Sequence, residues 1–91
     1  MIRILIVDDH SVVRQGLQMF LGLDEALEVV GEAANGEEAL EIYRSSLMPH
    51  SERHSTIDLV VTDVVMPRMG GKSLLRSLQA LTPQVKVLAM T

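Results

Sequence analysis

Three aspartates that directly follow apolar segments are the residues of this chain whose type and spacing point to chemistry. Asp8 and Asp9 come after the apolar run 4–7, and Asp63 follows the segment 58–62. Two adjacent carboxylates repel each other unless water or a cation screens their charges. Mg²⁺ takes oxygen ligands, usually one or two carboxylates together with waters and phosphate oxygens. The pattern therefore predicts a Mg²⁺ site, provided that the fold brings the aspartates together.

One carboxylate of such a site can also react. Asp63 stands alone at the end of its segment, and a turn that contains Pro67 follows it. A carboxylate beside Mg²⁺ can attack phosphorus and form an acyl phosphate. Asp63 is therefore the candidate nucleophile.

Apolar segments that read as strands must position these aspartates. The segment 2–7 is rich in β-branched residues and apolar at almost every position, which is typical of a strand covered on both faces in a parallel sheet. Similar segments predict strands at 28–34, 58–63 and 85–90. The three aspartates then lie at the carboxyl ends of the first and third strands, and Thr91 lies at the end of the fourth.

Amphipathic segments between these strands predict three helices. Ser11 is the expected N-cap of the first, whose apolar residues recur at helical spacing: Val12, Val13, Leu17, Phe20 and Leu21. Asn35 is the expected cap of the second helix, which runs through Tyr43 and fades near Ser46, with a loop over 44–57. The third helix is predicted over 72–81, before Pro83.

The alternation of strands and helices predicts an α/β fold with a parallel sheet and right-handed crossovers. Ligands of such sheets bind beyond the carboxyl ends of the strands. If the first and third strands are neighbours, the three carboxylates converge in one crevice. A hard divalent cation would relieve their repulsion.

Composition excludes several classes of function. The 91 residues suffice for one domain, and 47% of them are hydrophobic, which suits a packed core. The net charge of −4 without a Lys/Arg cluster argues against DNA binding by this segment. The chain has no cysteine, and its N-terminal apolar run fits neither a signal peptide nor a membrane span. We therefore expect a soluble cytoplasmic domain.

Three separated stretches resemble the signatures of response-regulator receiver domains. They are ILIVDDH at 4–10, TDVVMPRMGG at 62–71 and VLAMT at 87–91. The stretches DDHSVVRQGL and VVGEAANGEEAL also resemble the LuxR/NarL-type subfamily, whose members carry a C-terminal helix-turn-helix. The resemblance implies the flavodoxin-like (CheY-like) fold, with strand order 2-1-3-4-5 in a whole receiver.

The resemblance also implies roles for individual residues. Asp63 would accept a phosphoryl group from a sensor histidine kinase, and Thr91 would be the switch hydroxyl that contacts it. Asp8, Asp9, Asp63 and the backbone carbonyl of Val65 would hold Mg²⁺. The domain would not be an enzyme but a phosphoacceptor that assists its own phosphotransfer and dephosphorylation.

The sequence departs from whole receivers after Thr91, where a fifth strand ending in a lysine and two more helices are missing. We therefore expect residues 1–91 to be a C-terminally incomplete receiver domain, with strand order 2-1-3-4. An exposed fourth strand favours a homodimer or other self-association. DNA binding would require a C-terminal domain that this chain lacks.

Two other functions are compatible with part of the pattern. The missing lysine favours a receiver-like interaction or dimerisation module that is not phosphorylated. A haloacid-dehalogenase-type phosphatase also places aspartate after its first strand, but it needs Asp-x-Asp, and here Asp8 and Asp9 are adjacent. We expect His10 to be a surface histidine, and His50 and His54 to be solvent-exposed loop residues rather than a metal pair.

Overall fold

The computed structural model describes residues 2–47, 57–63, 71–82 and 85–90, which form four strands and three helices in alternation. The strands are β1 (Ile2–Val7), β2 (Leu27–Ala33), β3 (Leu59–Asp63) and β4 (Lys86–Met90). The helices are α1 (Ser11–Leu21), α2 (Gly36–Ser46) and α3 (Gly71–Leu81). The elements lie close to the predicted positions.

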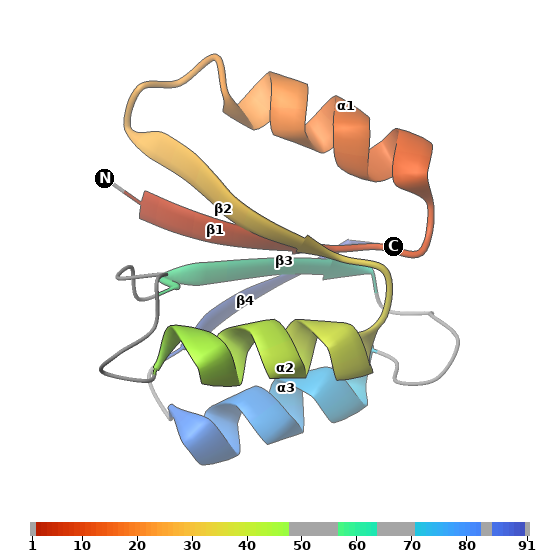
Figure 1. Ribbon diagram of the computed structural model, residues 1–91, viewed down its shortest axis with the longest axis vertical. Helices are drawn as coiled ribbons and strands as arrows, with labels where there is room; N and C mark the ends of the chain where they lie inside the picture. Colours follow the sequence, from red (N-terminus) through yellow and green to blue (C-terminus); the bar gives the residue numbers. More distant parts are fainter. Residues whose placement is uncertain (1, 48–56, 64–70, 83–84, 91) are drawn as a thin grey trace.

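The strands form one parallel sheet in the order β2-β1-β3-β4. Helix α1 lies on one face of this sheet, and α2 and α3 lie side by side on the other (Figure 1). The predicted flavodoxin-like (CheY-like) fold with strand order 2-1-3-4 is confirmed. All four strands point the same way, so their carboxyl ends share one edge of the sheet.

Strand β1 is central and contributes to the core on both of its faces. Successive side chains of a strand point to opposite faces. The buried residues form two hydrophobic clusters, a larger one on the side of α2 and α3 and a small one toward α1. Leu5 and Val7 belong to the larger cluster, whereas Ile4 and Ile6 belong to the small one. The nearly continuous apolar sequence of β1 therefore reflects burial on both sides, as predicted.

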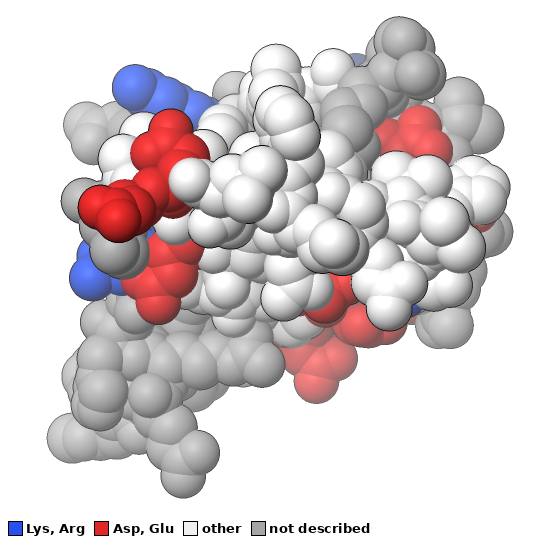
Figure 2. Space-filling view, turned by 90° about the horizontal axis from the view of Figure 1, so that it is seen from above, with Lys and Arg blue, Asp and Glu red and all other residues white. Residues whose placement is uncertain are grey.

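Helix α1 covers its face of the sheet with only part of its apolar surface. Leu17 and Leu21 pack against the small cluster toward α1, whereas Val12 and Phe20 are 77% and 71% exposed. At about 100° per residue, Val12 is turned about 140° from Leu17. The predicted helical spacing is present, but it does not by itself show which apolar residues of α1 are buried. Uncharged residues occupy much of the surface seen from this side (Figure 2).

The helix caps agree with the sequence at one helix and differ at the other. Oδ1 of Asn35 accepts a hydrogen bond from the backbone N–H of Glu38 at 2.9 Å, so the predicted cap of α2 is confirmed. Helix α1 instead begins at Ser11 with His10 in the N-cap position, and the His10 side chain makes no cap hydrogen bond. Ser11 as N-cap is therefore wrong. Residues 44–46, expected in a loop, are the last residues of α2.

None of the helices in the described ranges is both long enough and apolar enough to cross a membrane.

Candidate functional site

The acidic residues meet at the carboxyl edge of the sheet. Strands β1 and β3 pair in parallel with Val7 opposite Thr62, so Asp8 and Asp63 follow at the same level. Asp8, Asp9, His10 and Asp63 each place one carboxylate oxygen or ring nitrogen within 4.8 Å of the others. The structure thus brings the three sequence-predicted aspartates together. Val65 and Thr91, the other two predicted site residues, lie outside the described residues.

The three carboxylates differ in their exposure to solvent. Asp8 is buried, with a relative accessibility of 4%, whereas Asp63 is half-buried and Asp9 is exposed. Burial of a carboxylate is costly unless hydrogen bonds or an opposite charge compensate it. Asp8 therefore requires partners within the fold.

His10 supplies two of these contacts. Its backbone N–H donates to Oδ1 of Asp8 at 2.8 Å. Its ring nitrogen Nδ1 lies 2.9 Å from Oδ1 of Asp8 and 3.0 Å from Oδ1 of Asp9. The hydrogen bond with Asp8, followed by the charge of Asp9, raises the pKa of His10 above its usual value of 6.5. His10 is thus a positively charged partner for the acidic pair when it is protonated.

Arg14 fixes the backbone of the same loop. Its Nη1 donates to the backbone carbonyl of Asp8 at 2.5 Å, and its Nε donates to Oε1 of Glu32 at 3.3 Å. The Arg14 side chain is 19% exposed and that of Glu32 is 36% exposed. Because Glu32 belongs to β2 and Arg14 to α1, these bonds connect both elements to the loop that carries the acidic pair.

Sequence reasoning missed the part that His10 and Arg14 play in this site. His10 was expected only at the surface, and its side chain is indeed 65% exposed, yet its ring turns back over two carboxylates. Arg14 was not expected at the site. His10 and Arg14 are close to Asp8 in the sequence, which was the available signal. The loop conformation that turns their side chains toward Asp8, however, depends on contacts with β2.

This group of residues could hold a divalent cation. Oxygen ligands from several carboxylates suit Mg²⁺, and the positive charge would offset the repulsion between the aspartates. The donor set therefore fits a hard cation. A carboxylate held at such a site is also a potential nucleophile toward phosphorus.

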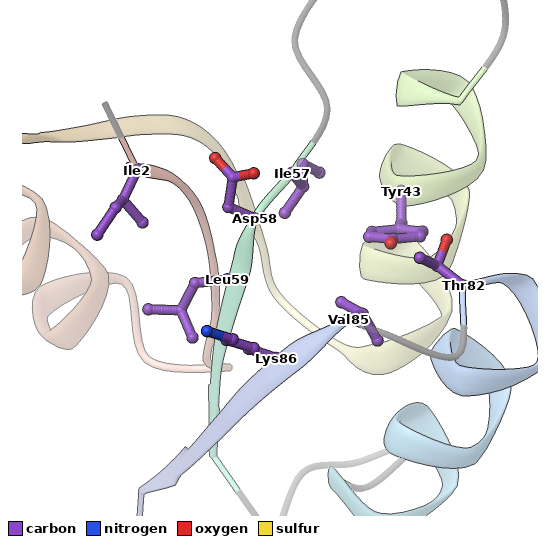
Figure 3. Close-up of a pocket in the computed structure, with 8 residues that line it drawn as sticks. All are labelled: Ile2, Tyr43, Ile57, Asp58, Leu59, Thr82, Val85 and Lys86. Carbon is purple, nitrogen blue, oxygen red and sulfur yellow. The ribbon is translucent and has the colours of Figure 1, made fainter.

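A cavity of about 400 Å³ lies at the opposite edge of the sheet, beside the first residues of β1, β3 and β4. Figure 3 shows its lining residues, among them Tyr43 from α2 beside Thr82 and Val85. The Tyr43 side chain is fully buried, and its hydroxyl has no hydrogen-bond partner among the described residues. This cavity is separate from the acidic edge, where the strands end.

Comparisons with known proteins agree on the type of domain. The sequence model of the family described as "Response regulator receiver domain" matches residues 4–91. The response regulator GacA of Pseudomonas viridiflava is 43% identical over the whole chain. A LuxR-family two-component response regulator from an Aurantimonas species is similar in structure, with a TM-score of 0.80 and 32% identity over 96% of this chain and 56% of that one.

A second similar structure is a chain of the CheX-CheY-BeF3-Mg²⁺ complex from Borrelia burgdorferi. It has a TM-score of 0.76 and 30% identity over 97% of this chain and 60% of that one. The chain spans 38% of the length of the GacA relative.

Proposed function

The chain belongs to the response regulator receiver family, and from this membership we propose that Asp63 accepts a phosphoryl group from a sensor histidine kinase. The observation that supports this role most directly is the meeting of Asp8, Asp9 and Asp63 at one edge of the sheet. This arrangement combines a nucleophilic carboxylate with two further acidic residues that suit a cation. The reaction would depend on Mg²⁺.

In the proposed reaction, a carboxylate oxygen of Asp63 attacks the phosphorus of the phosphodonor. A bond forms between this oxygen and phosphorus, and the bond from phosphorus to the donor nitrogen breaks. The donor histidine keeps the electron pair of that bond and takes a proton from solvent. Asp63 must be ionised to react, and its half-buried position at the end of β3 leaves it within reach of a donor.

Asp8, Asp9, Asp63 and the backbone carbonyl of Val65 would hold the cation. When bound, Mg²⁺ supplies positive charge that neutralises the oxygens of the transferred group. Arg14 and His10 fix Asp8 and Asp9 through the contacts described above. We propose that Thr91 contacts the phosphoryl group as a switch, and that the same site assists hydrolysis of the acyl phosphate.

The output of the domain is proposed from the family alone. Relatives such as GacA are response regulators of which this chain spans 38%. We propose that phosphorylation changes self-association of the domain and, through a helix-turn-helix domain in the whole protein, DNA binding. A cytoplasmic location follows from the same proposal.

Phosphoacceptance can be tested by incubating the protein with acetyl phosphate and Mg²⁺ and measuring its intact mass. We expect a gain of one phosphoryl group that EDTA abolishes. Asp63→Asn should show no gain, whereas Asp58→Asn, which changes an exposed aspartate just before the first residue of β3, should behave as wild type. A folded wild-type protein without mass gain would indicate an interaction module that is not phosphorylated.

A further inference from the structure

We propose that His10 is a nitrogen ligand of the cation at the acidic edge, so that this domain binds Co²⁺ more tightly than Mg²⁺. The inference rests on the proposed function, because it concerns the same cation site. It adds an imidazole to a site otherwise made of oxygen ligands, and with it a preference among cations.

The position of His10 follows from the path of the backbone. His10 has extended backbone angles, φ −102° and ψ 110°, and it precedes the first residue of α1. Its side chain makes no bond to the helix N-terminus, which is the usual role of a residue at this position. The ring instead faces the carboxylates of Asp8 and Asp9. His10 thus presents Nδ1 to the site, although most of its side chain is exposed.

The distances around Nδ1 fit the geometry of a single cation. Ligand atoms at adjacent corners of an octahedron with bonds of about 2.1 Å are about 3.0 Å apart, and opposite corners are about 4.2 Å apart. Nδ1 lies 2.9 Å and 3.0 Å from the oxygens of Asp8 and Asp9. With Asp63 included, one ligand atom from each of the four residues lies within 4.8 Å of the others. The 4.8 Å spread is wider than the distance of about 4.2 Å between opposite corners, so a cation that replaces the proton shared by His10, Asp8 and Asp9 requires the ligand atoms to draw closer together.

The chemistry of the ligands determines which cation gains from His10. Carboxylates suit Mg²⁺ and Mn²⁺, whereas imidazole suits later transition metals, and affinity rises from Mn²⁺ through Co²⁺ to Ni²⁺ at a given nitrogen and oxygen site. Mg²⁺ gains little from a nitrogen ligand. Loss of His10 should therefore weaken Co²⁺ binding selectively, while Mg²⁺ remains bound by the aspartates.

The test compares Co²⁺ and Mg²⁺ binding to His10→Gln and to its parent protein. The chain has two further histidines, His50 and His54, so both proteins carry His50→Gln and His54→Gln, which leaves His10 as the only imidazole of the parent. Calorimetric titration at mildly alkaline pH gives the two dissociation constants, and circular dichroism checks folding. Proton NMR with paramagnetic Co²⁺ detects coordinated imidazole directly through its strongly shifted ring protons.

We expect His10→Gln to weaken Co²⁺ binding about 10-fold or more, since even an outer-shell partner of a metal ligand is worth about 10- to 100-fold. Mg²⁺ binding should change about twofold at most, and the shifted imidazole signals of the parent should disappear. An equal change for both cations, tighter binding of both, or no shifted signals in the parent would overturn the inference.

The outcome also separates this inference from the proposed function. If Mg²⁺ binds and Asp63→Asn weakens it, but the ratio of Co²⁺ to Mg²⁺ affinity does not depend on His10, only the role of His10 is wrong. If neither cation binds to the folded parent, both the cation site and the ligand role of His10 are wrong.

Discussion

Substitution of Tyr43 by phenylalanine should stabilise the protein, which is the opposite of the usual effect of this change. The Tyr43 side chain is fully buried between α2 and the sheet, and its hydroxyl has no partner among the described residues. In the unfolded chain water satisfies this hydroxyl, so folding loses a hydrogen bond. Tyr43→Phe removes the hydroxyl and keeps the ring that packs in the core.

The size of the effect follows from the cost of an unsatisfied buried group. Leaving a buried donor or acceptor without a partner costs about 1–3 kcal/mol. Tyr43→Phe should therefore raise the free energy of unfolding by about 1–2 kcal/mol, the lower part of that range, because the hydroxyl borders a cavity. For a domain of this size, each kcal/mol corresponds to about 4–8 °C in Tm.

Urea unfolding followed by far-UV circular dichroism measures this change. Fluorescence is unsuitable, because the chain has no tryptophan and Tyr43 is its single tyrosine. An unchanged dependence of the unfolding free energy on urea would show that the substitution alters stability and not the unfolded state. Phe20→Tyr is the matched control: Phe20 is 71% exposed, so an added hydroxyl there should change stability by less than about 0.5 kcal/mol.

If Tyr43→Phe instead lowers the free energy of unfolding by about 1 kcal/mol or more relative to wild type, the hydroxyl is not an unsatisfied group, because such a loss is the ordinary result when a hydrogen-bonded hydroxyl is removed. The hydroxyl would then have a partner, such as a water molecule in the adjacent cavity.

Three further predictions concern the site and the core. Arg14→Ala should lower the unfolding free energy by about 1–2 kcal/mol in urea titrations, because the charged hydrogen bond to the Asp8 carbonyl is lost; Arg14→Lys retains the charge and should lose less. In metal-free protein, NMR titration should give His10 a pKa above 6.5. Its stabilising contact with Asp8 should therefore be complete below pH 6.5 and lost as the pH rises through that higher pKa, so that wild type and His10→Gln become equally stable in alkaline urea titrations. Leu78→Ala should lower the unfolding free energy by about 2–5 kcal/mol, since Leu78 is fully buried. Leu81→Ala should lower it by less than about 1 kcal/mol, since Leu81 is 39% exposed. Similar losses for the two variants would contradict the placement of α3.

Local patterns in the sequence were sufficient to predict most of the fold. Strand β1 was predicted with the observed bounds, and the cap of α2 at Asn35 was correct, because each depends on neighbouring residues alone. Asp8, Asp9 and Asp63 could be placed together because parallel strands end at the same edge.

Features that depend on packing between elements could not be read from the sequence. The apolar residues of α1 share a helical spacing, but which of them are buried depends on their contacts with the sheet: Leu17 and Leu21 pack against it, whereas Phe20 is exposed. His10 and Arg14 are directed to the acidic pair by the loop after β1 and by Glu32 of β2. No local pattern of residues indicates these long-range contacts.

The uneven covering of the two sheet faces has a consequence for how the domain fluctuates. None of the eleven residues of α1 is buried, whereas α2 contributes five buried residues. Segments with few buried contacts open at a lower free-energy cost than the rest of a domain. Amide protons of α1 should therefore exchange with solvent well before those of β1 and β3. Arg14 belongs to α1, so each such opening also releases the Asp8 carbonyl and links the acidic edge to the least firmly anchored helix of the described fold.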